Sequence, residues 1–219
     1  MKKPSTVTAL DELGRVQLSK SFFMRDFLYS EIGHLHGLSN IPDNPDVAIE
    51  AGRQICENLL EPLQDRFGRL AIRSSYRSKE VNGFGNARQR AKKSGYSCAS
   101  NDRNFGHHIW DERDRNGHLG ATVCLVIPSF IPLYDNGVSW TALAWWIHDN
   151  LPYSSMFFFP KNAAFNLRWC EVPERRIDSY IRPDKGTLTK PGMANNVGDH
   201  AACYSEVSAL LERSGTRSS

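Results

Sequence analysis

The chain has 219 residues, of which 40% are hydrophobic and 11% aromatic. This apolar content is sufficient for a folded core, which excludes a wholly disordered chain. Its 27 Lys and Arg residues stand against 24 Asp and Glu residues, so the formal net charge is only +3. An excess of this size does not by itself indicate nucleic-acid binding, and we do not expect nucleic acid as the partner.

The sequence predicts a cytoplasmic protein of one domain. No segment approaches the run of about 18 apolar residues that spans a membrane, and the most apolar stretch, residues 140–146, is short. The lysines at positions 2 and 3 are not followed by the apolar stretch of a secretory signal. The five cysteines are an odd number and form no CxxC pair, which is typical of free thiols in a reducing compartment.

The first part of the chain predicts helices followed by a strand. Residues 1–16 are polar, and we expect them to form a flexible N-terminus. From Ser21, a good N-cap, apolar residues recur at helical spacing. After an extended connector, a second helix is expected over residues 46–67, with Pro62 either kinking it or starting it anew. The run 70–76 is rich in β-branched and aromatic residues and predicts a strand.

The stretch 77–118 differs in composition from the rest of the chain. It is rich in Gly, Asn, Ser and Arg and nearly free of aliphatic residues, so we expect a long loop. A loop of this length inside a compact domain is more often functional than idle. It is followed by an expected strand over residues 120–128 and a short buried helix over residues 139–149.

The remaining elements complete the expected domain, residues 17–181. Two further strands are expected over residues 156–160 and 163–169. A polar C-terminal extension follows, residues 182–219, in which only 204–211 offers a last amphipathic turn or two. This order of elements predicts an α+β fold, with N-terminal helices packed on a small, mainly antiparallel sheet.

Two ordered motifs carry a resemblance to a known family. LLEPLQDRFG followed by LAIRSSYRSKEVN, residues 59–82, resembles the zinc D-alanyl-D-alanine carboxypeptidases of the Hedgehog/DD-peptidase fold. In that family a Leu-x-Pro-Leu run precedes a strand that ends Ser-Gly-Tyr-Arg-Ser, with an Asn a few residues on. The resemblance covers roughly residues 17–171. It implies that Arg77 binds a substrate carboxylate, with Ser74 and Asn82 beside it as substrate-binding residues.

The family holds one zinc with His, Asp and His, and uses a Glu as general base. GATVCLVIP, residues 120–128, resembles the family strand Gly-x-Ala-x-Asp, and Cys124 takes the Asp position. The family His lies seven residues before that Asp, but here that position is Gly117. His118 is one residue off, and a slip of one residue in a strand reverses the face of the side chain.

The expected metal ligands are therefore His107, His108, Cys124 and Cys170. The two histidines can serve only if residues 111–119 are an inserted hairpin, and Cys170 follows Trp169 where the family has its closing His. Thiolate and imidazole suit zinc well. The alternative is that the two cysteines are small buried residues left in a decayed site.

Proton transfer is expected from Asp111 or His148, and Glu171 is a further catalytic candidate or ligand. Each has a plainer interpretation: Asp111 as part of an exposed turn, and His148 as a favourable charge at a helix C-terminus.

The resemblance and the altered ligand positions lead us to expect one of two functions. The first is a divergent zinc-dependent peptidase or amidase that acts on a small peptide or peptidoglycan-like substrate. The alternative is a non-catalytic descendant of the fold that binds a peptide, a glycopeptide or a protein partner. A weaker third possibility is that the basic run 88–93 faces nucleic acid.

Overall fold

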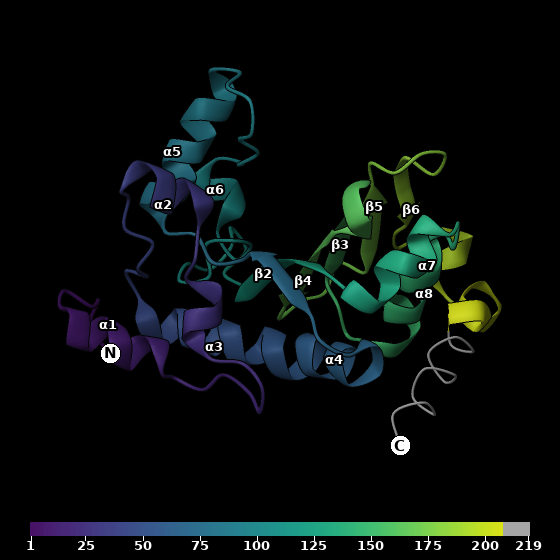
Figure 1. Cartoon of the computed structure of the whole chain (residues 1–219), viewed down its shortest axis with the longest axis horizontal. Coiled ribbons are helices and arrows are strands. Elements are labelled where there is room, and N and C mark those ends of the chain that lie inside the picture. Colours follow the sequence, from purple (N-terminus) through teal and green to yellow (C-terminus); the bar gives the residue numbers. More distant parts are fainter. Residues whose placement is uncertain (208–219) are drawn as a thin grey trace.

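The protein is an α+β structure built on a six-stranded mixed sheet, as the computed structural model of residues 1–207 shows (Figure 1). The strand order is β1-β2-β4-β3-β5-β6, and every neighbouring pair is antiparallel except β3 and β5. The predicted fold class and the mainly antiparallel sheet are confirmed. The strands are β1 (Ala71–Ser74), β2 (Gly120–Val126), β3 (Ser155–Phe158), β4 (Phe165–Cys170), β5 (Arg176–Ser179) and β6 (Gly186–Thr189).

The two faces of the sheet differ in chemistry because side chains alternate along each strand. On one face the central strands place Ala121, Val123, Leu125, Phe165 and Leu167 in the core, all of them fully buried. The register puts the intervening residues on the other face, which we call the open face. It carries Thr122, Cys124, Ser155, Phe157, Asn166 and Arg168.

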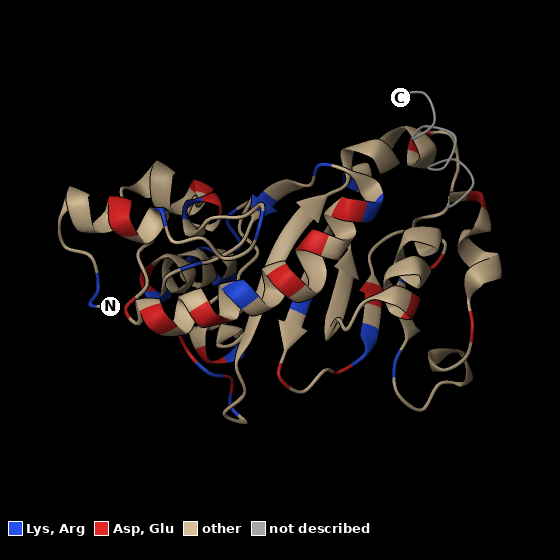
Figure 2. Ribbon diagram, turned by 90° about the horizontal axis from the view of Figure 1, so that it is seen from below, with Lys and Arg blue, Asp and Glu red and all other residues tan. Residues whose placement is uncertain are grey.

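The core face is covered by a long helical segment made of α3 (Pro45–Ile55), a π turn (Cys56–Leu60) and α4 (Glu61–Phe67). It packs on β2 and β4, and Figure 2 shows it crossing the strands. Pro62 does not break the segment, because the π turn comes just before it and Pro62 falls in the first turn of α4. The backbone stays in the right-handed helical region through Leu60 and Glu61, and Glu61 N donates to Cys56 O, so the π turn accommodates the missing N–H of Pro62 within a continuous helix.

The N-terminus differs from the expectation of a flexible segment. Residues Val7–Gly14 form α1, whose Thr6 side chain accepts a hydrogen bond from the backbone N–H of Ala9. Leu13 is fully buried, so α1 belongs to the folded domain. The helix expected from Ser21 is also divided, into η1 (Met24–Phe27) and α2 (Glu31–His36), because the side chain of Ser30 caps a new helix.

The expected long loop contains two helices, α5 (Lys79–Arg90) and α6 (Asn101–Asn104). Ser78 caps α5, but the helix is polar and offers almost no apolar periodicity to detect. In Figure 1 this part of the chain rises as a projection above the sheet. The remaining helices are α7 (Ile131–Asp135), the expected buried helix α8 (Trp140–Asn150), and the short 3-10 turns Pro128–Phe130, Lys161–Ala163 and Ala194–Asn196.

The predicted C-terminal extension contributes to the sheet, because its strand β6 pairs with β5 across the expected boundary after residue 181. Residues 201–207 are helical, and the rest of the turn expected up to residue 211 lies outside the described residues. Within residues 1–207, no helix is long and apolar enough to cross a membrane.

Candidate ligand-binding groove

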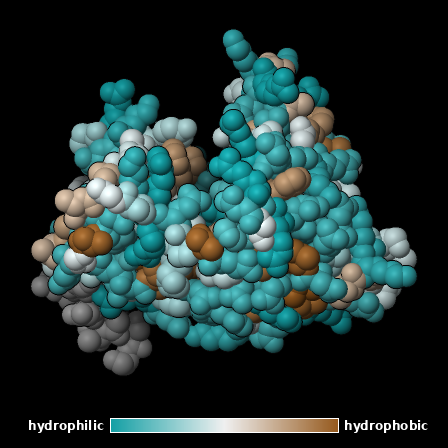
Figure 3. All heavy atoms as spheres, turned by 180° about the vertical axis from the view of Figure 1, so that it is seen from behind, coloured by the Kyte–Doolittle hydropathy of each residue, from teal (hydrophilic) through white to brown (hydrophobic). Residues whose placement is uncertain are grey.

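Two adjoining cavities form a groove on the open face of the sheet. The histidine cavity, about 280 Å³, is lined by Arg77, Arg103, His107, His108, Thr122, Asn166 and others. The cysteine cavity, about 520 Å³, is lined by Arg73, Ser74, Cys98, Cys124, Phe159 and others. Arg77, Ser97 and Asn166 line both cavities. The space-filling view from behind shows a notch between the α5–α6 projection and the side of the molecule that carries β5 and β6 (Figure 3).

Both histidines of the predicted metal site line the histidine cavity as neutral imidazoles. The backbone carbonyl of His107 accepts a hydrogen bond from Thr122 N, and that of His108 accepts one from Arg77 N. His108 Nδ1 lies 2.7 Å from the carbonyl oxygen of Ser75, so Nδ1 carries the proton and Nε2 keeps its lone pair. Burial, and then the charge of Arg77, hold the pKa of His108 well below its ordinary value.

His107 is neutral for a similar reason. Burial, followed by the charge of Arg168, lowers the pKa of His107 to about 4. At neutral pH the two imidazoles are therefore uncharged and can accept hydrogen bonds.

Arg77 is held in the groove by two buried side chains. Its Nη1 donates to Cys98 Sγ at 2.9 Å and to Asn82 Oδ1 at 3.3 Å. Asn82 is fully buried and donates to Ala99 O at 3.0 Å, so it positions Arg77 from behind and lines neither cavity. Within residues 1–207, no group hydrogen-bonds Nε or Nη2 of Arg77. That edge of the guanidinium is available to a ligand.

Thr122 contributes an unpartnered hydroxyl. Its side chain is only 4% exposed, and among the described residues Oγ1 has no hydrogen-bond partner. Leaving a buried hydroxyl unpaired costs about 1–3 kcal/mol. Because Thr122 lines the histidine cavity, a ligand there is the natural source of the missing hydrogen bond.

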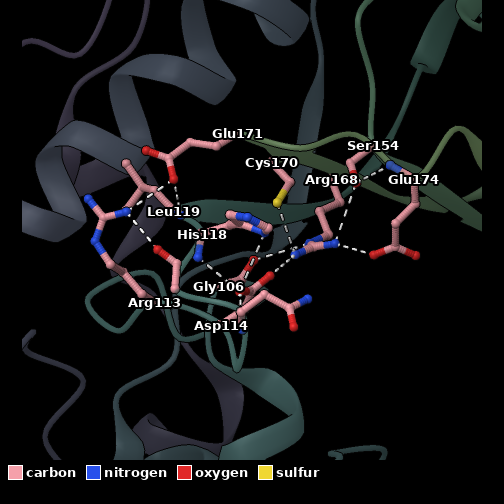
Figure 4. Close-up of polar contacts among 12 residues, drawn as sticks. Gly106, Arg113, Asp114, His118, Leu119, Ser154, Arg168, Cys170, Glu171 and Glu174 are labelled. Carbon is pink, nitrogen blue, oxygen red and sulfur yellow. Dashed lines mark hydrogen bonds and ion pairs between the residues drawn. The ribbon is translucent and has the colours of Figure 1, made fainter.

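Arg168 occupies the end of the histidine cavity and is saturated by protein contacts (Figure 4). Its Nε donates to Gly106 O at 3.1 Å, and its Nη1 donates to Glu174 at 2.5 Å and to Ser154 Oγ at 3.4 Å. Its Nη2 lies 3.5 Å from Asp114 Oδ2 and 3.4 Å from Cys170 Sγ. Guanidinium has five N–H groups, and all of them have a partner here.

The two cysteines of the predicted zinc site do not meet. Cys124 pairs with Asn166 and Cys170 pairs with Gly120, so both face the open side of the sheet. They stand four positions apart along the ladder, which corresponds to about 13 Å. Neither His107 nor His108 joins a group of three ligand atoms with either cysteine. The expected ligand set is corrected accordingly, and these four residues do not fit a zinc ion.

Two other groups among the described residues could hold a metal ion: Asp114, His118 and Cys170, and His148, Asp149 and His200. In each group the ligand atoms lie within 4.8 Å of one another. In the first group, the cationic side chain of Arg168 already contacts Asp114 and Cys170. A metal ion there would have to replace it.

The second group lines neither cavity, and its side chains already make hydrogen bonds within the protein. His148 Nδ1 lies 2.6 Å from the Tyr153 hydroxyl and its Nε2 lies 3.1 Å from Asn196 O. His200 Nδ1 lies 2.7 Å from Asp149 Oδ1, and the His200 ring stacks on Trp145 at 4.1 Å. His148 therefore packs the C-terminal segment onto α8, and its expected role in proton transfer is corrected.

The other two predicted catalytic residues also line neither the histidine nor the cysteine cavity. Asp111 is 2% exposed and accepts hydrogen bonds from Asp43 N at 2.7 Å and Tyr76 Oη at 3.2 Å. Glu171 is exposed and accepts from Leu119 N at 2.7 Å. Both residues hold loops in place through these hydrogen bonds. Neither of the two predicted catalytic carboxylates is therefore placed to act as a base in the groove.

The groove also contains residues that no sequence motif marked, namely Arg103, Thr122, Asn166 and the aromatic residues Phe157 and Phe159. One available signal was the alternation of Asn166 and Arg168 with the apolar residues of β4, which indicates a polar strand face. Comparisons with protein-family models, with curated proteins and with solved structures find no match to this chain.

Proposed function

We propose that the protein is a non-catalytic relative of the zinc D-alanyl-D-alanine carboxypeptidases. In this proposal it keeps a Hedgehog/DD-peptidase-like fold and binds the carboxylate end of a small peptide or peptidoglycan-like ligand. The observation that carries the proposal is the lining of the histidine cavity. It includes Arg77 with its free edge, Arg103, the unpartnered hydroxyl of Thr122 and no acidic side chain.

The free edge of Arg77 suits a carboxylate, because Nε and Nη2 can donate two parallel hydrogen bonds to its oxygens. Thr122 Oγ1 can donate a third hydrogen bond from the floor of the cavity. The lone pair of His108 Nε2 can accept from an N–H of the peptide. The resemblance supports the same assignment, since Arg77 is the position that the family motif gives to the carboxylate.

The lining also favours binding over catalysis. The histidine cavity has neither an assembled set of zinc ligands nor a carboxylate that could serve as a general base. A zinc peptidase needs both, the metal to activate water and the base to accept its proton.

Replacing Thr122 by Val should change ligand affinity and folding stability in opposite directions. The valine has the same branched shape without the unpaired hydroxyl, so we expect the free energy of unfolding to rise by about 1 kcal/mol. We expect the affinity for a dipeptide with a free carboxylate, such as D-Ala-D-Ala, to fall about tenfold, the equivalent of one hydrogen bond. Urea unfolding and calorimetric titration measure the two quantities.

The matching controls are the C-terminal amide of the same dipeptide and the variant Arg90→Met, whose side chain lines neither cavity. The amide should bind at least tenfold more weakly than the acid, and Arg90→Met should bind like the wild type. Equal binding of acid and amide, or unchanged affinity in Thr122→Val, would contradict the proposal.

A zinc-dependent peptidase is the second candidate, favoured by the grouping of Asp114, His118 and Cys170. We expect protein purified without chelators to contain well below one zinc per chain, because Arg168 already supplies the positive charge between Asp114 and Cys170. Elemental analysis measures this content, and Cys170→Ser is the matched variant. Stoichiometric zinc that Cys170→Ser loses, together with hydrolysis of the dipeptide, would replace the binding proposal with the peptidase.

A further inference from the structure

Three aromatic side chains lie together on the open face of the sheet. Phe157 and Phe159 leave β3 on this face, and Tyr180, just after β5, lies beside them. Ring centroids are 5.3 Å apart for Phe157 and Phe159, and 4.5 Å apart for Phe157 and Tyr180. Tyr180 is 55% exposed, and both phenylalanines are partly exposed. We call these three residues the aromatic cluster.

The aromatic cluster is continuous with the groove. Phe157 lines the histidine cavity and Phe159 lines the cysteine cavity. Arginines line the same two cavities: Arg77 in both, Arg103 in the first and Arg73 in the second. Among the residues that line the two cavities, the only acid is Glu31, in the cysteine cavity. A ligand that fits the groove therefore needs an anionic group beside an apolar one.

The angles between the rings indicate the shape of that apolar group. Phe157 is inclined by 42° to Phe159 and by 68° to Tyr180, so the rings present both edges and faces rather than one flat surface. Edge-to-face packing of this kind suits an inserted aromatic or branched aliphatic side chain. The flat face of a sugar or a base stacks best on a flat ring surface.

Building on the proposed carboxylate site, we infer that the ligand is a short peptide with a free C-terminal carboxylate and a bulky apolar side chain in one of its last two residues. The carboxylate lies at Arg77 and Thr122, and the apolar side chain packs on the aromatic cluster. A ligand that ends in two alanines reaches Arg77 but leaves most of the aromatic cluster uncovered. The inferred specificity therefore differs from the one that the family resemblance implies.

Calorimetric titration of the full chain with three acetylated dipeptides tests this inference. The peptides are acetyl-Gly-Gly, acetyl-Gly-Phe and acetyl-Phe-Gly, each with a free carboxylate. We expect at least one Phe-containing peptide to bind about tenfold or more tightly than acetyl-Gly-Gly. Tyr180→Ser should abolish this preference and leave the affinity for acetyl-Gly-Gly unchanged, because Tyr180 lines neither cavity.

The control variant is Tyr29→Ser, which removes a side chain of similar exposure, 59%, that lines neither cavity. If acetyl-Gly-Gly binds and phenylalanine brings no gain, the inference is wrong while the carboxylate site stands. If no peptide binds, the proposed function itself is wrong. N-acetylmuramic acid could instead bind as tightly as the Phe-containing peptides and lose affinity in Tyr180→Ser. That result would assign the aromatic cluster to a sugar and overturn the inference.

Discussion

Replacing Arg168 by alanine is expected to lower the free energy of unfolding by about 3 kcal/mol. The Arg168 side chain is only 3% exposed, and its loss leaves Asp114 and the Gly106 carbonyl without their cationic partner. Asp114 is itself largely buried, with its side chain 14% exposed, so water can replace the guanidinium only in part. Urea unfolding monitored by tryptophan fluorescence measures the change.

Two further variants test whether the loss of stability is specific to the buried side chain of Arg168 or is common to surface ion pairs. Arg168→Lys keeps the charge but cannot reach five acceptors, so its stability should lie between those of the wild type and Arg168→Ala. Arg113→Ala removes an exposed pair with Glu171 and should cost less than about 1 kcal/mol. If Arg168→Ala is as stable as Arg113→Ala, then Arg168 does not organise this end of the groove.

Acidification should destabilise the protein through His107. Burial and Arg168 lower the pKa of His107 from 6.5 to about 4 in the folded state. Between these two values the unfolded chain binds a proton that the folded chain does not. The stability that neutral His107 contributes is therefore present above pH 6.5 and is lost as the pH falls toward 4. Over this range the loss amounts to about 3 kcal/mol, of which about 2 kcal/mol falls between pH 7 and pH 5.

His107→Gln should remove this contribution, because glutamine does not titrate. We expect the stability difference between pH 7 and pH 5 to shrink by about 2 kcal/mol in His107→Gln relative to the wild type. The contribution of buried His108, whose pKa is also lowered, should remain in both proteins. His34→Gln, on the exposed side of α2, is the matched control and should behave as the wild type. An unchanged pH dependence in His107→Gln would show that water reaches His107 in the folded protein.

The elements with a clear apolar run or apolar periodicity were predictable from the sequence. The apolar run of β2 and the capped helix α8 lie where they were expected. Helices α1, α5, α6 and α7 were missed, because α1, α6 and α7 have eight residues or fewer and α5 is polar. α1 is stabilised by the Thr6 cap and the burial of Leu13, and α5 is a polar helix whose support comes from buried Asn82 and its partners.

The residues of the candidate site were predictable only where a sequence motif or an unusual local composition surrounded them. Arg77 followed from the motif around it, and His107 and His108 followed from their unusual loop, and all three line the histidine cavity. The separation of Cys124 from Cys170 depends on the pairing of β2 with β4, which are not consecutive strands, so no local pattern shows how far apart the two thiols lie. The same holds for Asp111 and His148, whose partners are distant in the chain.

Many of the residues that line the groove come from a part of the chain that contributes nothing to the main apolar core. Strands β1 and β2 are direct neighbours, so everything between them is a single excursion from one edge of the sheet. None of the residues 77–109 belongs to the main apolar core, yet this stretch supplies Arg77, Arg103, His107 and His108 to the groove. Substitutions of the groove-lining residues within 77–109 can therefore change which ligand the groove accepts without altering the main apolar core, to which the flanking residues Tyr76, Trp110 and Leu119 belong.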